Sequence, residues 1–346
     1  MKLFSSIFSL LFVSLVLGLL IYQKWGPQPF VRPVIVGLSS YPVSSEEIEF
    51  LRKARPYGIL IFGRRPFLLE AQTVIIQLKK ELKRPDLLFF VDHEGGEVNR
   101  FYRQNPKHFP SARHFGKLAE QNLEQAKKEI YANALEAGKE IKEIGIDVVL
   151  GPAAEICLKE NFLKTRCHSK DPVITAEMAE SFARDIADAG LEPGYKHLPG
   201  IGAADKDMHT ENSIVNRTIE ELRTQEALAM QYAKNWKYAM TSHAVYPALD
   251  PTNVTTFSPK VNQFIREELG FQGFIITDAL DMKGANIGEL SVGERIQKAL
   301  EAGADIVIPA FWRSSLDEQW QELQKISPEQ IEKFNKKLRE YKKAEK

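Results

Sequence analysis

The sequence shows no excess of either charge, contains very little cysteine and has no low-complexity segment. Its 346 residues include 46 Lys and Arg against 46 Asp and Glu, so the formal net charge is zero. A balanced charge without a long basic block gives no support for a nucleic-acid partner. Hydrophobic residues make up 44% and charged residues 27%, the composition of a globular protein. A chain of this length can form one large domain or two medium ones.

Only two cysteines are present, Cys157 and Cys167. Their spacing differs from the C-x-x-C of redox and zinc sites. In an oxidising compartment they could form a disulfide, which would close a short loop and stabilise the fold by roughly 3 kcal/mol in the chain-entropy model. Two free thiols agree with the sequence equally well, so their pairing stays open at this point.

Motifs for nucleotides and metals are also missing. No G-x-G-x-x-G follows the first apolar run, and the chain contains no Walker loop. The first apolar run, residues 34–38 (VIVGL), lacks the H-x-H that metal-dependent barrel hydrolases usually carry, which argues against that class. We therefore expect no cofactor and no metal.

The N-terminus carries the longest apolar run. Residues 3–22 contain no charged side chain, and as a helix they would reach ~30 Å, the thickness of the hydrocarbon core of a bilayer. No clear A-x-A site follows, which favours a signal anchor over a cleaved signal peptide for residues 1–25. Residues 26–33 then read as a linker. We expect the remaining residues, 34–346, to lie outside the cytoplasm, in the periplasm or the extracellular space.

From residue 34 onward, short apolar runs alternate with amphipathic stretches, which predicts parallel β/α units. Eight such runs favour a single closed (β/α)8 TIM-type barrel over an open doubly wound sheet. We predict strands over residues 34–38, 58–62, 87–92, 147–150, a run ending at 197, 238–243, 273–278 and 305–309. We predict helices from Ser44 and over residues 67–82, 122–144, 176–189, 219–234, 259–269, 294–302 and about 333–346.

The stretch 191–211 concentrates polar chemistry next to glycine and proline. It contains Lys196 and His197, a turn-rich Leu-Pro-Gly-Ile-Gly, and then Asp207 and His209. This composition is typical of a mobile catalytic loop, and a solvated surface loop is the alternative.

Polar residues also close several of the apolar runs. Asp92, Lys196 with His197, His243 and Asp278 each stand at the C-terminal end of a different run. In a (β/α)8 barrel those ends share one face, and that face carries the active site. We therefore expect these side chains to converge there.

Four motifs occur in order between residues 34 and 309. They are Asp92-His93-Glu94-Gly95-Gly96 with Val98 and Arg100; residues 196–200 (KHLPG) followed by Asp207-x-His209; residues 240–243 (MTSH) with 246–250 (YPALD); and residues 266–271 (REELGF) running into Thr277-Asp278 and Met282. In this series the chain resembles glycoside hydrolase family 3, and within it the single-domain β-N-acetylglucosaminidases.

The resemblance implies a retaining exo-β-N-acetylglucosaminidase that acts on peptidoglycan fragments. Asp278 aligns with the nucleophile, which forms a covalent glycosyl-enzyme. His209 aligns with the general acid/base and Asp207 with the residue that orients it. Five further residues align with sugar-binding positions: Asp92, Arg100, Arg166, Lys196 and His197. For the two arginines a structural salt bridge is the alternative.

The sequence departs from the family pattern at two places. The usual G-H-G reads Gly200-Ile201-Gly202 here, so one imidazole is missing, and Glu155 stands where the family commonly has an aspartate. A family 3 β-glucosidase and a membrane-tethered glycan-binding protein without turnover remain alternatives. We expect His243 to support the site rather than act in it, and His93 and His168 to be bystanders.

Overall fold

The computed structural model describes residues 30–38, 41–62, 68–101, 109–158, 162–286, 288–310 and 314–344. The chain divides into two compact units, residues 1–31 and 32–346, and every element named below belongs to the second. The apolar run 3–22, predicted to be a signal anchor or signal peptide, lies outside the described residues. Within the described ranges, no helix is both long enough and apolar enough to cross a membrane.

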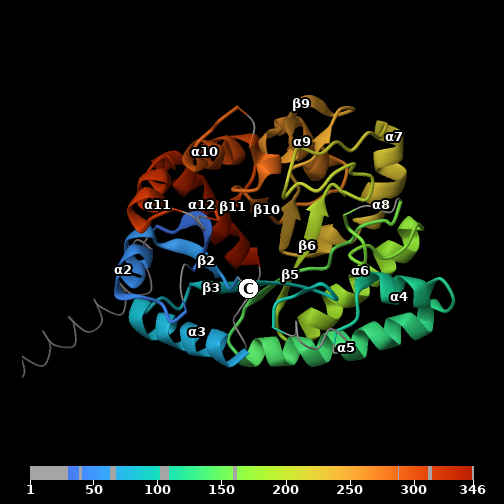
Figure 1. Ribbon diagram of the computed structural model, residues 1–346, viewed down its shortest axis with the longest axis horizontal. Coiled ribbons are helices and arrows are strands. Elements are labelled where there is room, and N and C mark those ends of the chain that lie inside the picture. Colours follow the sequence, from blue (N-terminus) through green and yellow to red (C-terminus); the bar gives the residue numbers. More distant parts are fainter. Residues whose placement is uncertain are drawn as a thin grey trace, which may run out of the picture. The chain divides into compact units, whose positions relative to one another are not determined.

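Eight parallel strands close into a barrel, as the alternating pattern predicts (Figure 1). The pairing runs in chain order, and β2–β3 and β1–β11 contacts complete the ring. β1 begins two residues earlier than predicted, inside the expected linker. The strands are β1 (Arg32–Gly37), β2 (Pro56–Leu60), β3 (Leu88–Gly95), β5 (Val148–Leu150), β6 (Glu192–Leu198), β7 (Tyr238–Thr241), β10 (Phe274–Ala279) and β11 (Ile306–Ile308).

Helices surround the strands, and several begin at capping residues that are visible in the sequence. The side chains of Ser44, Asn122, Asp171, Ser258 and Ser291 each accept a hydrogen bond from a backbone N–H of the first turn. The main helices are α2 (Ser45–Ala54), α3 (Leu68–Leu82), α4 (Ala112–Ala119), α5 (Leu123–Glu143), α6 (Pro172–Asp188), α9 (Pro259–Glu267), α10 (Val292–Ala302), α11 (Leu316–Leu323) and α12 (Pro328–Ala344).

One predicted helix is broken. Instead of a continuous helix over 219–234, the chain forms α7 (Ile219–Glu221), a π-helical turn (Leu222–Glu226), α8 (Ala227–Ala229) and a 3₁₀ turn (Ala233–Asn235). The π turn places Glu226 against Gly200, where a Cβ would lie 2.9 Å from the Glu226 Cβ. The π turn therefore coincides with a tertiary contact to the stretch 191–211, which contains Gly200. Such turns occur frequently near functional sites.

The helices α4 and α11 were not predicted, nor was the hairpin of β8 (Val245–Tyr246) and β9 (Asp250–Val254). A short strand, β4 (Val98–Asn99), also pairs antiparallel with the end of β3. The helix α4 has only eight residues and contains Gly116, so its own propensity is weak. A Cβ at Gly116 would lie 1.8 Å from the carbonyl oxygen of His168. Close packing against this distant segment therefore requires glycine inside the helix.

Aromatic side chains fill the barrel at the N-terminal ends of its strands. Tyr57, Tyr238 and Phe274 lie at the first or second position of three strands and pack together, with 2.5 Å between the two tyrosine hydroxyls. Phe334 of α12 packs edge-on against Tyr57, with ring centroids 5.2 Å apart. Because this end is filled, a substrate must enter from the opposite, C-terminal ends of the strands.

The two cysteines are bonded in the structure. Cys157 and Cys167 form a disulfide with their Cα atoms 5.3 Å apart. The bond joins the segment that follows β5 to the segment that precedes α6, which decides between the two alternatives that the sequence left open.

Candidate active site

A cavity of about 710 Å³ opens at the C-terminal ends of the barrel strands. Residues from the ends of seven strands line it, including Leu60 of β2, Leu150 of β5 and Ile308 of β11. Three of the four expected polar strand ends, at Asp92, at Lys196 with His197, and at Asp278, converge on this cavity, whereas His243 does not line it. Seven of the eight predicted site residues line this cavity: Asp92, Arg100, Arg166, Lys196, His197, His209 and Asp278.

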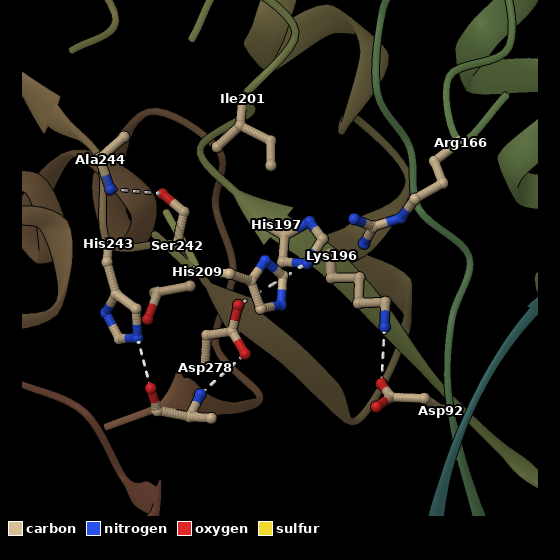
Figure 2. Close-up of polar contacts among 12 residues, drawn as sticks. Asp92, Arg166, Lys196, His197, Ile201, His209, Ser242, His243, Ala244 and Asp278 are labelled. Carbon is tan, nitrogen blue, oxygen red and sulfur yellow. Dashed lines mark hydrogen bonds and ion pairs between the residues drawn. The ribbon is translucent and has the colours of Figure 1, made fainter. Parts of the chain in front are cut away.

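One wall of the cavity is a network of alternating charges. The Lys196 Nζ lies 2.7 Å from Asp92 Oδ1 and 2.7 Å from Glu94 Oε1. Arg166 donates two hydrogen bonds to the Glu94 carboxylate, at 2.8 and 3.0 Å. Arg100 donates one to Asp92 at 3.0 Å. Figure 2 shows the Lys196–Asp92 contact on the side of the site away from His243.

Asp92, Glu94 and Lys196 are held in their charged forms. Burial alone would raise the pKa of Asp92 and of Glu94, but the neighbouring cations hold both pKa values far below the usual range. Burial opposes the charge on Lys196 too, yet the two carboxylates raise its pKa. Fixed carboxylates and an ammonium of this kind can accept from and donate to vicinal hydroxyls without changing protonation.

Glu94 is a member of the site for which the sequence indicates no role. It belongs to the first motif, in which the resemblance points to Asp92 as the sugar-binding residue. The structure shows Glu94 joining Lys196 to Arg166, with only 2% of its side chain exposed. The same contacts show that the pairing of Arg166 is both a salt bridge and part of the cavity wall, so the two interpretations of this arginine are compatible.

Asp278 ends β10 on the opposite wall, with 21% of its side chain exposed. Its Oδ1 accepts a hydrogen bond from the Ala279 N–H at 2.7 Å, and its Oδ2 lies 4.0 Å from His197 Nε2. In Figure 2 the carboxylate points toward the His197 side of the site. One oxygen is thus oriented by the backbone, while the other faces the cavity.

His243 lies behind Asp278, where a supporting role was predicted. It is fully buried, and burial lowers the pKa of its imidazole, so the ring is neutral. Its Nε2 lies 2.9 Å from the carbonyl oxygen of Ala279, which can only accept, and its Nδ1 lies 2.6 Å from the Thr256 hydroxyl. The ring therefore holds the Ala279–Leu280 peptide, one residue beyond Asp278.

The His209–Asp207 pair stands on the loop after β6. The Nδ1 of His209 lies 2.8 Å from Asp207 Oδ1, which also accepts from the His209 backbone N–H at 3.0 Å. Burial would raise the pKa of Asp207, but the hydrogen bonds from His209 lower it, so the carboxylate stays ionised. Asp207 thus favours a proton on Nδ1 and leaves Nε2 to exchange one with a bound molecule. The His209 side chain is 62% exposed, at the cavity mouth.

Glu155, one of the two departures from the family pattern, ties this loop to the wall that carries Asp278. Its Oε1 accepts from the His197 N–H at 2.8 Å and lies 3.2 Å from His197 Nδ1. Its Oε2 accepts from the Ile201 N–H at 2.7 Å. One buried carboxylate therefore orients the ring beside Asp278 and holds the start of the loop. This role depends on contacts 42 and 46 residues away, which no local motif indicates.

Ile201, the other departure, is 1% exposed and belongs to the hydrophobic core. The neighbouring Gly200 carbonyl accepts from the Tyr246 hydroxyl at 2.6 Å. Behind Gly200, burial raises the pKa of Glu226 to about 7, and the Arg217 Nε lies 3.4 Å from the Glu226 Oε1. Apolar packing and backbone hydrogen bonds hold the loop at the position where the family usually has an imidazole.

Residues 37–339 match the model of the glycosyl hydrolase family 3 N-terminal domain. The chain belongs to glycoside hydrolase family 3. A beta-hexosaminidase of Psychromonas ingrahamii is 30% identical over 292 residues, which cover 82% of this chain and 84% of that protein. As a member of this family the chain is a glycoside hydrolase, and the barrel-mouth cavity is its candidate active site.

Solved structures of this family show the same fold. NagZ from Neisseria gonorrhoeae superposes with a TM-score of 0.75 at 26% identity, covering 84% of this chain and 85% of that one. A family 3 β-N-acetylglucosaminidase from a Paenibacillus species superposes with a TM-score of 0.79 at 24% identity, covering 90% of this chain and 61% of that longer chain. The second likeness concerns the fold alone.

Proposed function

We propose that this family 3 hydrolase is a retaining exo-β-N-acetylglucosaminidase. The observation that carries the proposal is that one cavity is lined by the Asp278 carboxylate and by His209, whose imidazole is oriented by Asp207. The beta-hexosaminidase name of the Psychromonas relative supports the choice of sugar.

The charged wall provides the binding step. Asp92, Glu94 and Lys196 line the cavity, and aromatic side chains fill the barrel beyond it, at the N-terminal ends of the strands. A single terminal sugar placed there has its hydroxyls within reach of fixed carboxylates and an ammonium. A cavity that is open at one end only favours removal of one sugar from a chain end, which is an exo mode of action.

The reaction then proceeds in two displacements at the anomeric carbon. In the first, the Asp278 oxygen forms a bond to C1 as the bond from C1 to the leaving oxygen breaks, and protonated His209 gives its proton to that oxygen. In the second, His209 takes a proton from water, the water oxygen bonds to C1, and Asp278 departs. Two inversions give net retention. The acid/base is an imidazole, which differs from the usual pair of carboxylates.

An aryl-glycoside panel tests the proposed activity. The full chain in detergent is expected to cleave 4-nitrophenyl N-acetyl-β-glucosaminide with a kcat/KM at least about tenfold above that for the β-glucoside and β-xyloside. A sugar that lacks the acetamido group leaves the polar groups of the site that would bind it without a partner, which strongly disfavours that sugar. Proton NMR should show the β-anomer released first. A preference for the glucoside would favour the β-glucosidase alternative. Binding without turnover on all three substrates would favour the glycan-binding alternative.

We propose further that the catalytic unit is exported and acts on peptidoglycan fragments. The uncharged run 3–22 and the Cys157–Cys167 disulfide support an oxidising compartment outside the cytoplasm. With purified muropeptides, release of N-acetylglucosamine is expected, and protease added to intact spheroplasts should digest the catalytic unit. Protection from protease in intact spheroplasts, with digestion after lysis, would contradict the export proposal.

A further inference from the structure

Two segments that carry site residues are joined by the disulfide. Glu155 lies two residues before Cys157, and Arg166 lies directly before Cys167. Two backbone hydrogen bonds join the described parts of these segments: the His168 N–H donates to the Glu155 carbonyl at 3.0 Å, and the Cys157 N–H donates to the Ser169 carbonyl at 2.7 Å. They form one isolated parallel bridge rather than a strand pair of the barrel.

The first of these residues controls the nucleophile side of the cavity. The Glu155 carboxylate receives the N–H groups of His197 and Ile201, at 2.8 and 2.7 Å. His197 in turn places its Nε2 4.0 Å from Asp278 Oδ2. A displacement of the Glu155 segment would therefore move the ring that faces the nucleophile.

The second residue controls the binding side. Arg166 makes a bidentate contact with Glu94, at 2.8 and 3.0 Å, and Glu94 contacts Lys196 at 2.7 Å. Only 15% of the Arg166 side chain is exposed. A displacement of the Arg166 segment would leave a buried carboxylate with one cation fewer, which disturbs the charged wall.

We propose that the Cys157–Cys167 disulfide is a positioning element of the active site, which holds the Glu155 and Arg166 segments together so that both walls of the cavity keep their spacing. The inference rests on the proposed function for its catalytic consequence, but its structural content stands on the contacts above. The cross-link restricts local separation of two segments that share few backbone hydrogen bonds and lie outside the barrel sheet.

The test compares the wild-type chain with Cys157→Ser/Cys167→Ser, at a temperature well below both unfolding midpoints. We expect kcat/KM on the aryl N-acetylglucosaminide to fall about tenfold or more, since small misplacements of active-site groups have effects of this size. Hydrogen exchange of the peptide covering residues 196–202 should accelerate at least about tenfold, because the His197 and Ile201 amides lose their fixed acceptor. Exchange in α9 should not change.

Leu338→Ala is the matched control. Leu338 is a buried residue of α12, far along the chain from the disulfide, and its truncation lowers the unfolding midpoint without touching the cavity wall. This variant should keep the wild-type kcat/KM and the wild-type exchange of residues 196–202. A double serine variant that behaves like Leu338→Ala, with a lowered midpoint only, would overturn the inference.

Two further arms keep the outcome decisive. If the wild type hydrolyses no glycoside, the proposed function fails, while the hydrogen exchange of residues 196–202 still decides whether the disulfide positions the site.

If the serine variant does not fold, the folded wild type is treated with a phosphine reductant, which is oxidised to its oxide as the disulfide becomes two thiols. Unchanged exchange in the reduced protein, with reduction confirmed by mass, would then overturn the inference.

Discussion

Asp278→Ala is expected to lower kcat on aryl N-acetyl-β-glucosaminides by roughly 10⁴-fold or more, the size of loss seen when a covalent nucleophile is removed. Without this carboxylate no bond to C1 can form, while the charged wall still binds the sugar, so KM should change much less than kcat. Added azide, which is small enough to enter the space left by the side chain, should restore turnover and give the α-glycosyl azide. Steady-state kinetics and NMR of the product provide the measurement.

Asp281→Asn is the matched control for this variant. Asp281 is an exposed carboxylate that lines the same cavity three residues later. Its replacement changes the local charge in the same way but should lower kcat by less than about tenfold. A loss of comparable size in both variants would mean that Asp278 acts through its charge alone. The covalent glycosyl-enzyme can also be trapped, and peptide mapping then identifies the residue that carries the sugar. A sugar attached to a residue other than Asp278 would exclude Asp278 as the nucleophile.

His209→Ala should lower kcat/KM on substrates with a poor leaving group by about 10²–10⁴-fold, the range for general acid catalysis. A dinitrophenyl leaving group departs without a proton, so its kcat/KM should fall much less. Asp207→Asn keeps the imidazole but removes the charge that orients its Nδ1 proton, so an intermediate loss is expected. A series of aryl glycosides with leaving groups of different acidity measures this dependence.

The control for this pair is Lys206→Ala. Lys206 lies on the same loop and forms an exposed ion pair with Glu211 at 2.6 Å, a contact of little energetic weight. Its removal should leave kcat/KM unchanged for every leaving group. An equal loss for His209→Ala across the whole series would contradict a role in protonating the leaving oxygen.

Much of the fold could be read from local pattern. The alternation of apolar runs and amphipathic stretches predicted the eight barrel strands, because strands buried on both faces are apolar along their length. The capping residue Ser44 marked the start of α2 for the same kind of local reason, whereas α6 begins at Pro172, before the predicted residue 176. The broken helix after Thr218 and the short helix α4 were not predictable in this way, since each depends on contact with a distant segment, at Gly200 and His168 respectively.

The candidate site divides in the same way. Asp92, Lys196 and Asp278 were identified because each ends an apolar run, and the barrel brings those ends to one face. Glu94 and Glu155 are as closely involved, but their functions consist of contacts with residues far away in the chain. Nothing in their immediate sequence distinguishes a carboxylate that bridges two walls from one that faces solvent.

Residue type and spacing therefore suffice for the barrel, for the family, and for the residues that end its strands, because these depend on patterns repeated within a few residues. Only the tertiary structure decides which partner each charged group has and that Cys157 bonds to Cys167. It also decides the contacts of Glu155 with His197 and of Arg166 with Glu94. Such contacts join segments that the closed barrel brings together, and their strength comes from burial, which no single stretch of sequence can specify.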